Sequence, residues 1–251
     1  MPAQPVIVIP IHKPDLTALE RYSLDVSVAA LPGRTLVFIG PEGLALDYYR
    51  QHFPAIPFRA YDAQSFASIQ GYNRLLLNPA FYEGFAGHTH MLVLQTDAVV
   101  LRDELDHWCA QPFDYVGAPW PDGVELFVNL GRFEGDRGRR VRAMVGNGGL
   151  SLRRLDTHAA LLREFPEAAD YFVRSGSSED LFFSLMGNLS ASFVLPNEIT
   201  ASRFALELKP AFYFAVNGGV APMAGHAWWK YDVPFWRTLL PPSPVLDSLP
   251  A

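Results

Sequence analysis

The sequence predicts an α/β protein built on a mostly parallel sheet. Short apolar runs alternate with amphipathic stretches along the first hundred residues, and this alternation is typical of βαβ units. The 251 residues are 49% hydrophobic and only 18% charged, a composition that suits a globular protein with a sizeable core. We expect a single domain over 1–251, with a regular half at about 1–103 and a less regular half at about 104–251.

In the first half of the sequence, predicted strands and helices alternate along the chain. Apolar runs predict buried strands at Val6–Ile11, Thr35–Ile39 and Met91–Leu94, and a further short strand is expected at Phe58–Tyr61. Apolar positions at three- and four-residue spacing predict helices, at Leu16–Leu31, Leu46–Phe53 and Ser65–Phe85. The first helix has Asp15 or Thr17 as its cap, and Pro79 is a point of interruption in the last.

The second half is less regular. Two short strands are expected around a glycine-rich turn, at Val141–Val145 and Gly149–Leu152. Two helices are expected at Thr157–Phe165 and Glu179–Met186, the second capped by Ser177 or Ser178. The rest is rich in proline and aromatic residues, and we expect it to form loops over the sheet.

Charge and composition exclude several classes of protein. A net charge of −6 and a pI near 5.6 argue against a nucleic-acid partner, which needs a basic surface. A single cysteine, Cys109, forms no intramolecular disulfide. The N-terminus lacks the basic region of a signal peptide, and no apolar stretch approaches the roughly 18 residues of a transmembrane segment. We therefore expect a cytoplasmic protein; the aromatic-rich tail from Phe204 leaves peripheral contact with the inner membrane surface open.

A lone carboxylate between two apolar runs is the most informative feature of the chain. Residues 91–101 read MLVLQTDAVVL, so Asp97 follows a buried strand directly. A buried carboxylate is costly unless it is paired or binds a metal, and ligands of open α/β sheets bind beyond the carboxyl ends of the strands. The alternative is a strand-end aspartate that caps a turn, and this residue alone does not decide between the two.

Three later segments also carry candidate chemistry. Gly148 and Gly149 lie between apolar runs, which allows a ligand to approach the backbone or simply makes a turn. Glu179 and Asp180 begin a predicted helix, where acids either favour the helix dipole or act as a general base. His226 lies beside two tryptophans, as a packed side chain or as a metal ligand.

The order of these segments resembles the GT-A glycosyltransferase core, with Gln95-Thr96-Asp97 at the place of its Asp-x-Asp motif. More narrowly, four segments resemble an uncharacterised family, "domain of unknown function 5672", which is placed near GT-A enzymes. They are Ile9–Pro14, Ser68–Arg74, Tyr115–Trp120 and Gly225–Trp228. The resemblance implies a nucleotide-binding half followed by an acceptor-binding half, and the transfer of a sugar from a nucleotide donor to an acceptor hydroxyl.

The resemblance also implies a divalent cation, Mn²⁺ or Mg²⁺, with Asp97 and His226 as its protein ligands. Gln95 departs from the pattern, because it replaces an acid, and one carboxylate fewer weakens a site for hard cations. Asp180 is the expected general base, with Glu179 as second candidate, and an inverting reaction follows from that role.

The remaining expectations concern substrate contacts. A UDP-sugar is the favoured donor, and its contacts are expected at Pro10, Ile11, His12, Asn73, Arg74, Gln95, Asp97, Gly148, Gly149 and Lys230. A glycan or another hydroxyl compound is the expected acceptor, stacked on Trp120, Trp228 or Trp229. A solvated helix charge is an equal alternative for Arg74, and core packing is the stronger alternative for each tryptophan.

Two other functions compete with sugar transfer. A nucleotidyltransferase is expected to carry a glycine-rich loop after its first strand, and the segment Ile11–Asp15 contains no glycine. A non-catalytic nucleotide- or carbohydrate-binding protein derived from a GT-A enzyme stays open, because Gln95 replaces a metal-binding acid.

Overall fold

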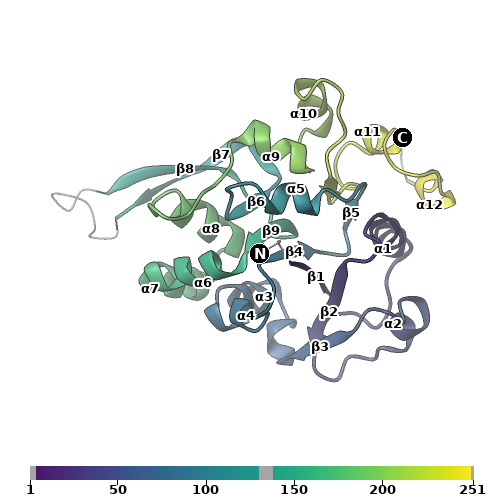
Figure 1. Ribbon diagram of the computed structural model, residues 1–251, viewed down its shortest axis with the longest axis horizontal. Helices are drawn as coiled ribbons and strands as arrows, with labels where there is room; N and C mark the ends of the chain where they lie inside the picture. The colour runs from purple at the N-terminus through teal and green to yellow at the C-terminus, as the bar shows by residue number, and fades with distance from the viewer. Residues whose placement is uncertain (1–3, 130–137, 250–251) are drawn as a thin grey trace.

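A six-stranded sheet forms the centre of the computed structural model, which describes residues 4–129 and 138–249 (Figure 1). The strand order is β3-β2-β1-β4-β9-β6. Four strands are parallel: β1 (Pro5–Pro10), β2 (Thr35–Pro41), β3 (Phe58–Tyr61) and β4 (His90–Leu94). The strand β9 (Leu150–Arg154) runs antiparallel to β4 and to β6 (Tyr115–Gly117). The predicted α/β class with a mostly parallel sheet is confirmed.

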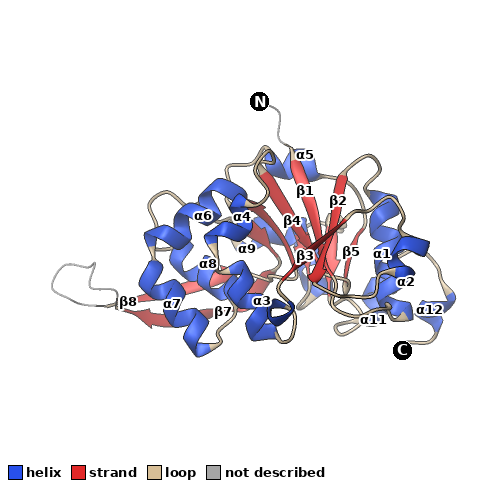
Figure 2. Cartoon of the chain, turned by 90° about the horizontal axis from the view of Figure 1, so that it is seen from below, coloured by secondary structure: helices blue, strands red, loops and turns tan. Residues whose placement is uncertain are grey.

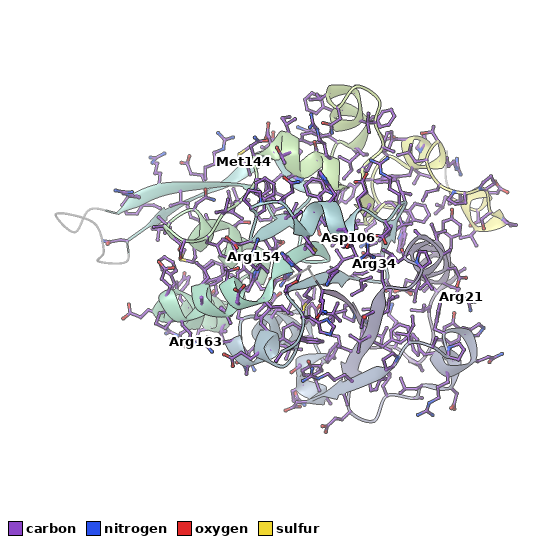
Figure 3. All side chains as sticks on the ribbon, viewed as in Figure 1. Arg21, Arg34, Asp106, Met144, Arg154 and Arg163 are labelled. Atoms are coloured by element: carbon purple, nitrogen blue, oxygen red, sulfur yellow. The ribbon has the colours of Figure 1, made fainter. Side chains whose placement is uncertain are left out.

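Helices cover both faces of this sheet (Figure 2). Successive residues of a strand point to opposite faces, so Val6 and Val8 pack on one side while Ile7 and Ile9 pack on the other. The first side is covered by α3 (Ile69–Leu76), α4 (Pro79–Glu83), α6 (Leu155–Glu164), α7 (Pro166–Ser175) and α8 (Glu179–Gly187). The second is covered by α1 (Ala18–Ala30), α2 (Asp47–His52) and α5 (Leu105–Cys109). Burial on both faces explains the continuous apolar runs of the central strands β1 and β4. Side chains fill the space between the sheet and its helices (Figure 3).

Two smaller sheets extend this core. The strand β5 (Ala98–Val100) pairs antiparallel with β11 (Ala224–His226), which pairs parallel with β10 (Ala205–Leu206). The strands β7 (Pro119–Val128) and β8 (Arg139–Val145) form a separate ribbon that extends from the body (Figure 1). The β5–β11 pairing matters most for the site. It brings His226, at the end of β11, beside the segment that follows β4.

The first half follows the predicted elements closely. Thr17 is the cap of α1, and its hydroxyl and Glu20 form a capping box. The long pattern over Ser65–Phe85 is divided into α3 and α4, after a 3₁₀ turn at Ala63–Ser65. Pro79 occupies the first turn of α4, where a missing N–H costs nothing.

The expectation of loops in the rest of the second half was wrong. Helices form there at α7, α9 (Glu198–Phe204), α10 (Pro210–Val216), α11 (Val233–Arg237) and α12 (Pro244–Asp247). A proline lies in the first turn of α7, α10, α11 and α12. Proline is favoured at that position because its fixed φ suits the helix, so residues that seemed to break helices begin them instead. The two strands around the glycine-rich turn exist, but they belong to different sheets.

Candidate functional site

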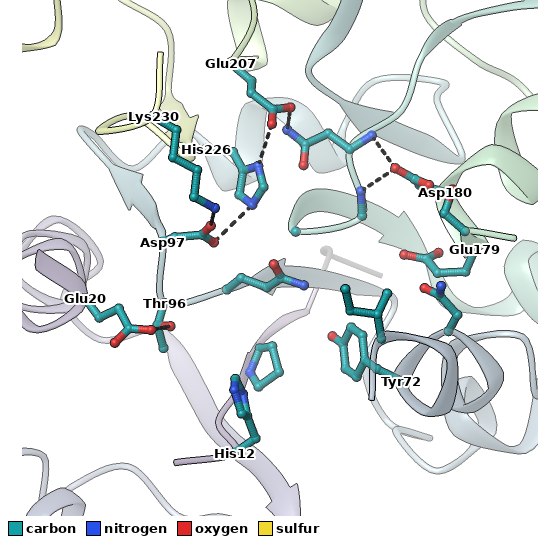
Figure 4. Close-up of a pocket in the computed structure, with 18 of the residues that line it drawn as sticks. His12, Glu20, Tyr72, Thr96, Asp97, Glu179, Asp180, Glu207, His226 and Lys230 are labelled. Carbon is teal, nitrogen blue, oxygen red and sulfur yellow. Dashed lines mark hydrogen bonds and ion pairs between the residues drawn. The ribbon is translucent and has the colours of Figure 1, made fainter. Parts of the chain in front are cut away.

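A cavity of about 1020 Å³ opens at the carboxyl ends of β1 and β4 (Figure 4). Its walls come from the segments after β1 and β4, the starts of α3 and α8, the turn at residues 147–149, and the segment around β11. This is the edge where open α/β sheets bind ligands. Ionisable side chains from distant parts of the chain meet in it.

Asp97 lies just after the end of β4, where its carboxylate contacts the side chains of His226 and Lys230. Its Oδ1 lies 3.1 Å from Nε2 of His226, and its Oδ2 accepts a hydrogen bond of 2.8 Å from Nζ of Lys230. Burial alone would raise the pKa of Asp97, but His226 and then Lys230 hold that pKa well below its usual value. The carboxylate is therefore ionised at neutral pH.

Strand pairing places His226 beside this carboxylate. In the β5–β11 ladder His226 lies opposite Ala98, and the N–H of Ala227 donates to the carbonyl oxygen of Asp97. The other ring nitrogen, Nδ1, lies 3.3 Å from Oε1 of Glu207. Burial lowers the pKa of His226, but the two flanking carboxylates outweigh it and raise the pKa to about 9. Glu207 was not predicted from the sequence, because the two-residue strand β10 before it gives no periodic signal.

The pair Asp97 and His226 fits one side of a divalent-cation site. Both ring nitrogens of His226 are buried and lack a hydrogen-bond partner of good geometry. Neighbouring ligands of an octahedral ion lie about 3 Å apart, given bonds of about 2.1 Å, and the 3.1 Å between Oδ1 and Nε2 agrees with this. Within residues 4–129 and 138–249, no three His, Cys, Asp or Glu side chains group as a complete metal site. An ion at this place would be held by Asp97 and His226 among the described residues, and its other ligands would come from outside the protein.

Asp180 holds the glycine-rich turn. Its Oδ2 accepts hydrogen bonds of 3.1 Å from the backbone N–H groups of Asn147 and Gly148. Its Oδ1 accepts a hydrogen bond from the N–H of Leu181 in the first turn of α8. Asn147 has a φ of 75°, in the left-handed region that asparagine tolerates. Asp180 is half-buried and lines the cavity, so it remains accessible from the cavity.

Glu179 binds a buried side chain, whereas its neighbour Asp180 binds backbone N–H groups. Both of its oxygens accept hydrogen bonds from the guanidinium of Arg153, at 2.9 and 3.0 Å. Arg153 is 0% exposed, and it also donates to the carbonyl oxygen of Gly148 and the hydroxyl of Tyr82. Glu179 is 3% exposed, whereas Asp180 is half-buried, so Asp180 is the more accessible of the two carboxylates. This difference favours Asp180 over Glu179 as the candidate base, and both roles stay predictions.

Arg153 was not singled out from the sequence, although a signal existed. It lies in an apolar strand next to the glycine-rich turn, and a charged residue inside a buried strand requires a buried partner. Glu179 and Asp180, the acids that begin α8, were candidates for this buried partner, and the structure shows that the partner is Glu179.

The two glycines are required for close packing rather than for unusual φ angles. A Cβ on Gly148 would lie 2.1 Å from Oε1 of Glu179, and one on Gly149 would lie 2.2 Å from Nε2 of His226. A Cβ on Gly149 would also lie 2.7 Å from Oε1 of Gln95. The absence of side chains at these two glycines thus lets Glu179, His226 and Gln95 pack directly against the backbone of the turn.

A substitution at Gly149 is expected to displace the imidazole. Because the new methyl group of Gly149→Ala overlaps Nε2 of His226, the ring must rotate away from Asp97. We expect Mn²⁺ affinity to fall by about tenfold or more, and the midpoint of thermal unfolding without metal to fall by about 2–10 °C because the methyl group overpacks a buried turn. Isothermal titration with Mn²⁺ measures the first quantity, and circular dichroism the second. A wild-type affinity in this variant would contradict the assignment of His226.

Most residues predicted for the site line this one cavity: Pro10, His12, Asn73, Gln95, Asp97, Trp120, Gly148, Gly149, Glu179, Asp180, His226, Trp229 and Lys230. Their individual roles stay predictions. Trp120 lies against Gly146, where a Cβ would overlap its ring. Trp120 and Trp229 are half-buried and can contact a ligand.

Three predicted residues lie elsewhere. Ile11 is 1% exposed because strand alternation turns its side chain into the core. Arg74 is exposed on α3 and is not part of the cavity wall, which favours the solvated-charge alternative. Trp228 is 0% exposed, and its Nε1 donates to Oγ of Ser23 in α1. The burial of Trp228 agrees with core packing, the stronger alternative for each tryptophan, and leaves no ring face for stacking.

Comparison with known proteins agrees with this architecture. The model of the family "Protein of unknown function (DUF5672)" matches residues 55–226, more than half of the chain. The chain belongs to this family. Asp97, the turn at 147–149, Asp180, Glu207 and His226 all lie within the matched range. No curated protein sequence matches the DUF5672 chain.

Solved structures of GT-A glycosyltransferases share the fold. Mouse xyloside xylosyltransferase 1 in its apo form is 12% identical, with a TM-score of 0.52, over 88% of this chain and 96% of the other. An active-site mutant of LgtC is 18% identical, with a TM-score of 0.53, over 88% and 86%. The galactosyltransferase LgtC in complex with donor and acceptor sugar analogues is 16% identical, with a TM-score of 0.51, over the same shares. This likeness shows a glycosyltransferase-like fold of GT-A type.

Proposed function

We propose that this protein is a glycosyltransferase that moves a sugar from a nucleotide-sugar to an acceptor hydroxyl. The observation that carries the proposal is the meeting of Asp97 and His226 in a cavity that Asp180 also lines. An ionised carboxylate and an imidazole at one end suit a metal-bound diphosphate. A second, accessible carboxylate suits proton removal from an acceptor.

The donor end rests on a divalent cation, Mn²⁺ or Mg²⁺. Asp97 and His226 would hold the ion, which supplies Lewis-acid stabilisation of the departing nucleoside diphosphate. Lys230 lies 2.8 Å from Asp97 and is 54% exposed, so its flexible side chain can turn to a phosphate. We take a UDP-sugar as the donor, with Pro10, His12, Asn73 and Gln95 along its path; this choice of base rests on the GT-A resemblance.

Asp180 is the proposed general base. It removes the proton of the acceptor hydroxyl as that oxygen attacks the anomeric carbon, and direct attack inverts the configuration. Trp120 and Trp229 offer faces for a sugar of the acceptor. The acceptor class is a glycan or another hydroxyl compound.

The second candidate is a nucleotide- or carbohydrate-binding protein without turnover. Two observations favour it: Gln95 stands in place of an acid, and Lys230 already neutralises Oδ2 of Asp97. Such a protein would bind a donor and never release a nucleoside diphosphate.

Release of nucleoside diphosphate from a panel of nucleotide-sugars, with Mn²⁺ and a set of glycan acceptors, tests the proposal. We expect release with one donor that requires an acceptor, and an inverted anomeric signal in the ¹H NMR spectrum of the product. Donor binding without release under every acceptor condition would support the binding protein. A retained configuration would refute the role of Asp180 as base.

In the part of the chain that the structure describes, no helix is both long and apolar enough to cross a bilayer. The cytoplasmic location stays a prediction from composition.

A further inference from the structure

Glu207 joins two parts of the cavity that the sequence keeps far apart. It follows β10, whose Leu206 pairs in register with Gly225 of β11. The next residues along these parallel strands are Glu207 and His226, so their side chains lie together at the same edge (Figure 4). One oxygen of Glu207 lies 3.3 Å from Nδ1 of His226, and the other accepts a hydrogen bond of 2.7 Å from Nδ2 of Asn147.

The contact with Asn147 extends to the proposed base. The side chain of Asn147 binds Glu207, while its backbone N–H binds Asp180. The residue is 5% exposed and held at a φ of 75°. A continuous chain of contacts thus runs from Asp97 through His226, Glu207 and Asn147 to Asp180. It connects the donor end of the cavity to the acceptor end.

We propose that Glu207 is a positioning residue that prepares His226 to bind a metal ion and sets its distance from the Asp180 turn. This inference rests on the proposed function, in which His226 binds the ion. The carboxylate of Glu207, 3.3 Å from Nδ1, favours a proton on Nδ1. When an ion takes the place of the proton on Nε2, the lone pair of Nε2 would face that ion beside Oδ1 of Asp97. A carboxylate behind the imidazole also strengthens the imidazole as a ligand.

A purely structural role for Glu207 makes a different prediction. In that case its loss would weaken the fold and leave metal affinity per folded molecule unchanged. Glu207 is partly accessible, with a side chain that is 17% exposed, and an amide of the same size fits its place. The variant Glu207→Gln therefore separates the two roles.

The test is an isothermal titration of the full chain with MnCl₂ after removal of metal by EDTA. We expect Glu207→Gln to bind Mn²⁺ about 10- to 100-fold more weakly than wild type, with an unchanged urea midpoint in EDTA. The matched control is Glu125→Gln, because Glu125 forms an exposed ion pair with Arg140 on the β7–β8 ribbon. The control is expected to bind Mn²⁺ as wild type does. Asp97→Ala provides the fully disrupted site.

The outcomes separate this inference from the proposed function. If wild type binds Mn²⁺, Asp97→Ala does not, and Glu207→Gln binds normally, the role of Glu207 is overturned while the metal site stands. A lowered urea midpoint with normal Mn²⁺ affinity also overturns it, in favour of a structural role. If wild type binds no Mn²⁺, the metal-dependent function fails, and the role of Glu207 fails with it.

Discussion

Replacement of Arg153 by methionine is expected to lower the free energy of unfolding by about 3–5 kcal/mol. Arg153 and Glu179 form a fully buried pair with two hydrogen bonds between their charged groups. Removal of the guanidinium leaves a carboxylate in the core without a partner. The carbonyl oxygen of Gly148 and the hydroxyl of Tyr82 lose a donor as well. The loss is therefore expected to exceed that of a typical surface ion pair by several fold.

Urea unfolding of the two variants Arg153→Met and Arg140→Met measures this difference. Arg140 pairs with Glu125 at the surface, where both side chains are well exposed, so its loss is expected to cost less than about 1 kcal/mol. Adding Glu179→Gln to Arg153→Met removes the stranded charge and is expected to recover part of the stability. Equal destabilisation by the two single variants would show that the buried pair is not what holds the turn.

Replacement of Asp180 by asparagine is expected to reduce turnover by about 10²- to 10⁴-fold, the usual contribution of a general base. The amide oxygen of asparagine can still accept the N–H groups of Asn147 and Gly148, so the turn is expected to keep its position, while the N–H of Leu181 loses its acceptor. Donor affinity should therefore stay close to wild type, and the free energy of unfolding should fall by about 0.5–1.5 kcal/mol. The rate of nucleoside diphosphate release at saturating donor and acceptor measures the effect.

The companion variant for this test is Asp180→Ala, which removes both the base and the acceptor of the two N–H groups. We expect it to lose turnover as Asp180→Asn does, and to lose more stability, because the N–H groups of Asn147, Gly148 and Leu181 then all lack their acceptor. Full turnover in Asp180→Asn would remove Asp180 from the mechanism and leave it as an anchor for the turn.

The sequence was most informative where burial alone decided the residue type at every position of an element. Continuous apolar runs identified β1 and β4, because a strand that is buried on both faces is apolar throughout. It was least informative after Phe165, where elements are short and depend on long-range packing. Prolines such as Pro166 and Pro210 marked helix starts there, yet the same residue also marks loops, and local sequence does not separate these cases.

The same limit applies to the site. Asp97, Asp180 and His226 stood out because each is polar among apolar neighbours, and they do line one cavity. Glu207 lies in an irregular segment, and only the pairing of β10 with β11 brings it to His226. For Trp228 the sequence left stacking and core packing both open, since nothing in the local sequence reveals that Ser23 of α1 accepts its N–H.

Calorimetric titration of UDP, with Mn²⁺ and with EDTA, into wild type and Asp97→Ala tests the central claim most directly. A metal-bound diphosphate site at Asp97 and His226 predicts binding in Mn²⁺, little binding in EDTA, and none that depends on the metal in Asp97→Ala. The same titration with other nucleoside diphosphates identifies the base if UDP is not the donor nucleotide. Equal affinity with and without metal, or wild-type binding by Asp97→Ala, would contradict the proposed metal-dependent donor site.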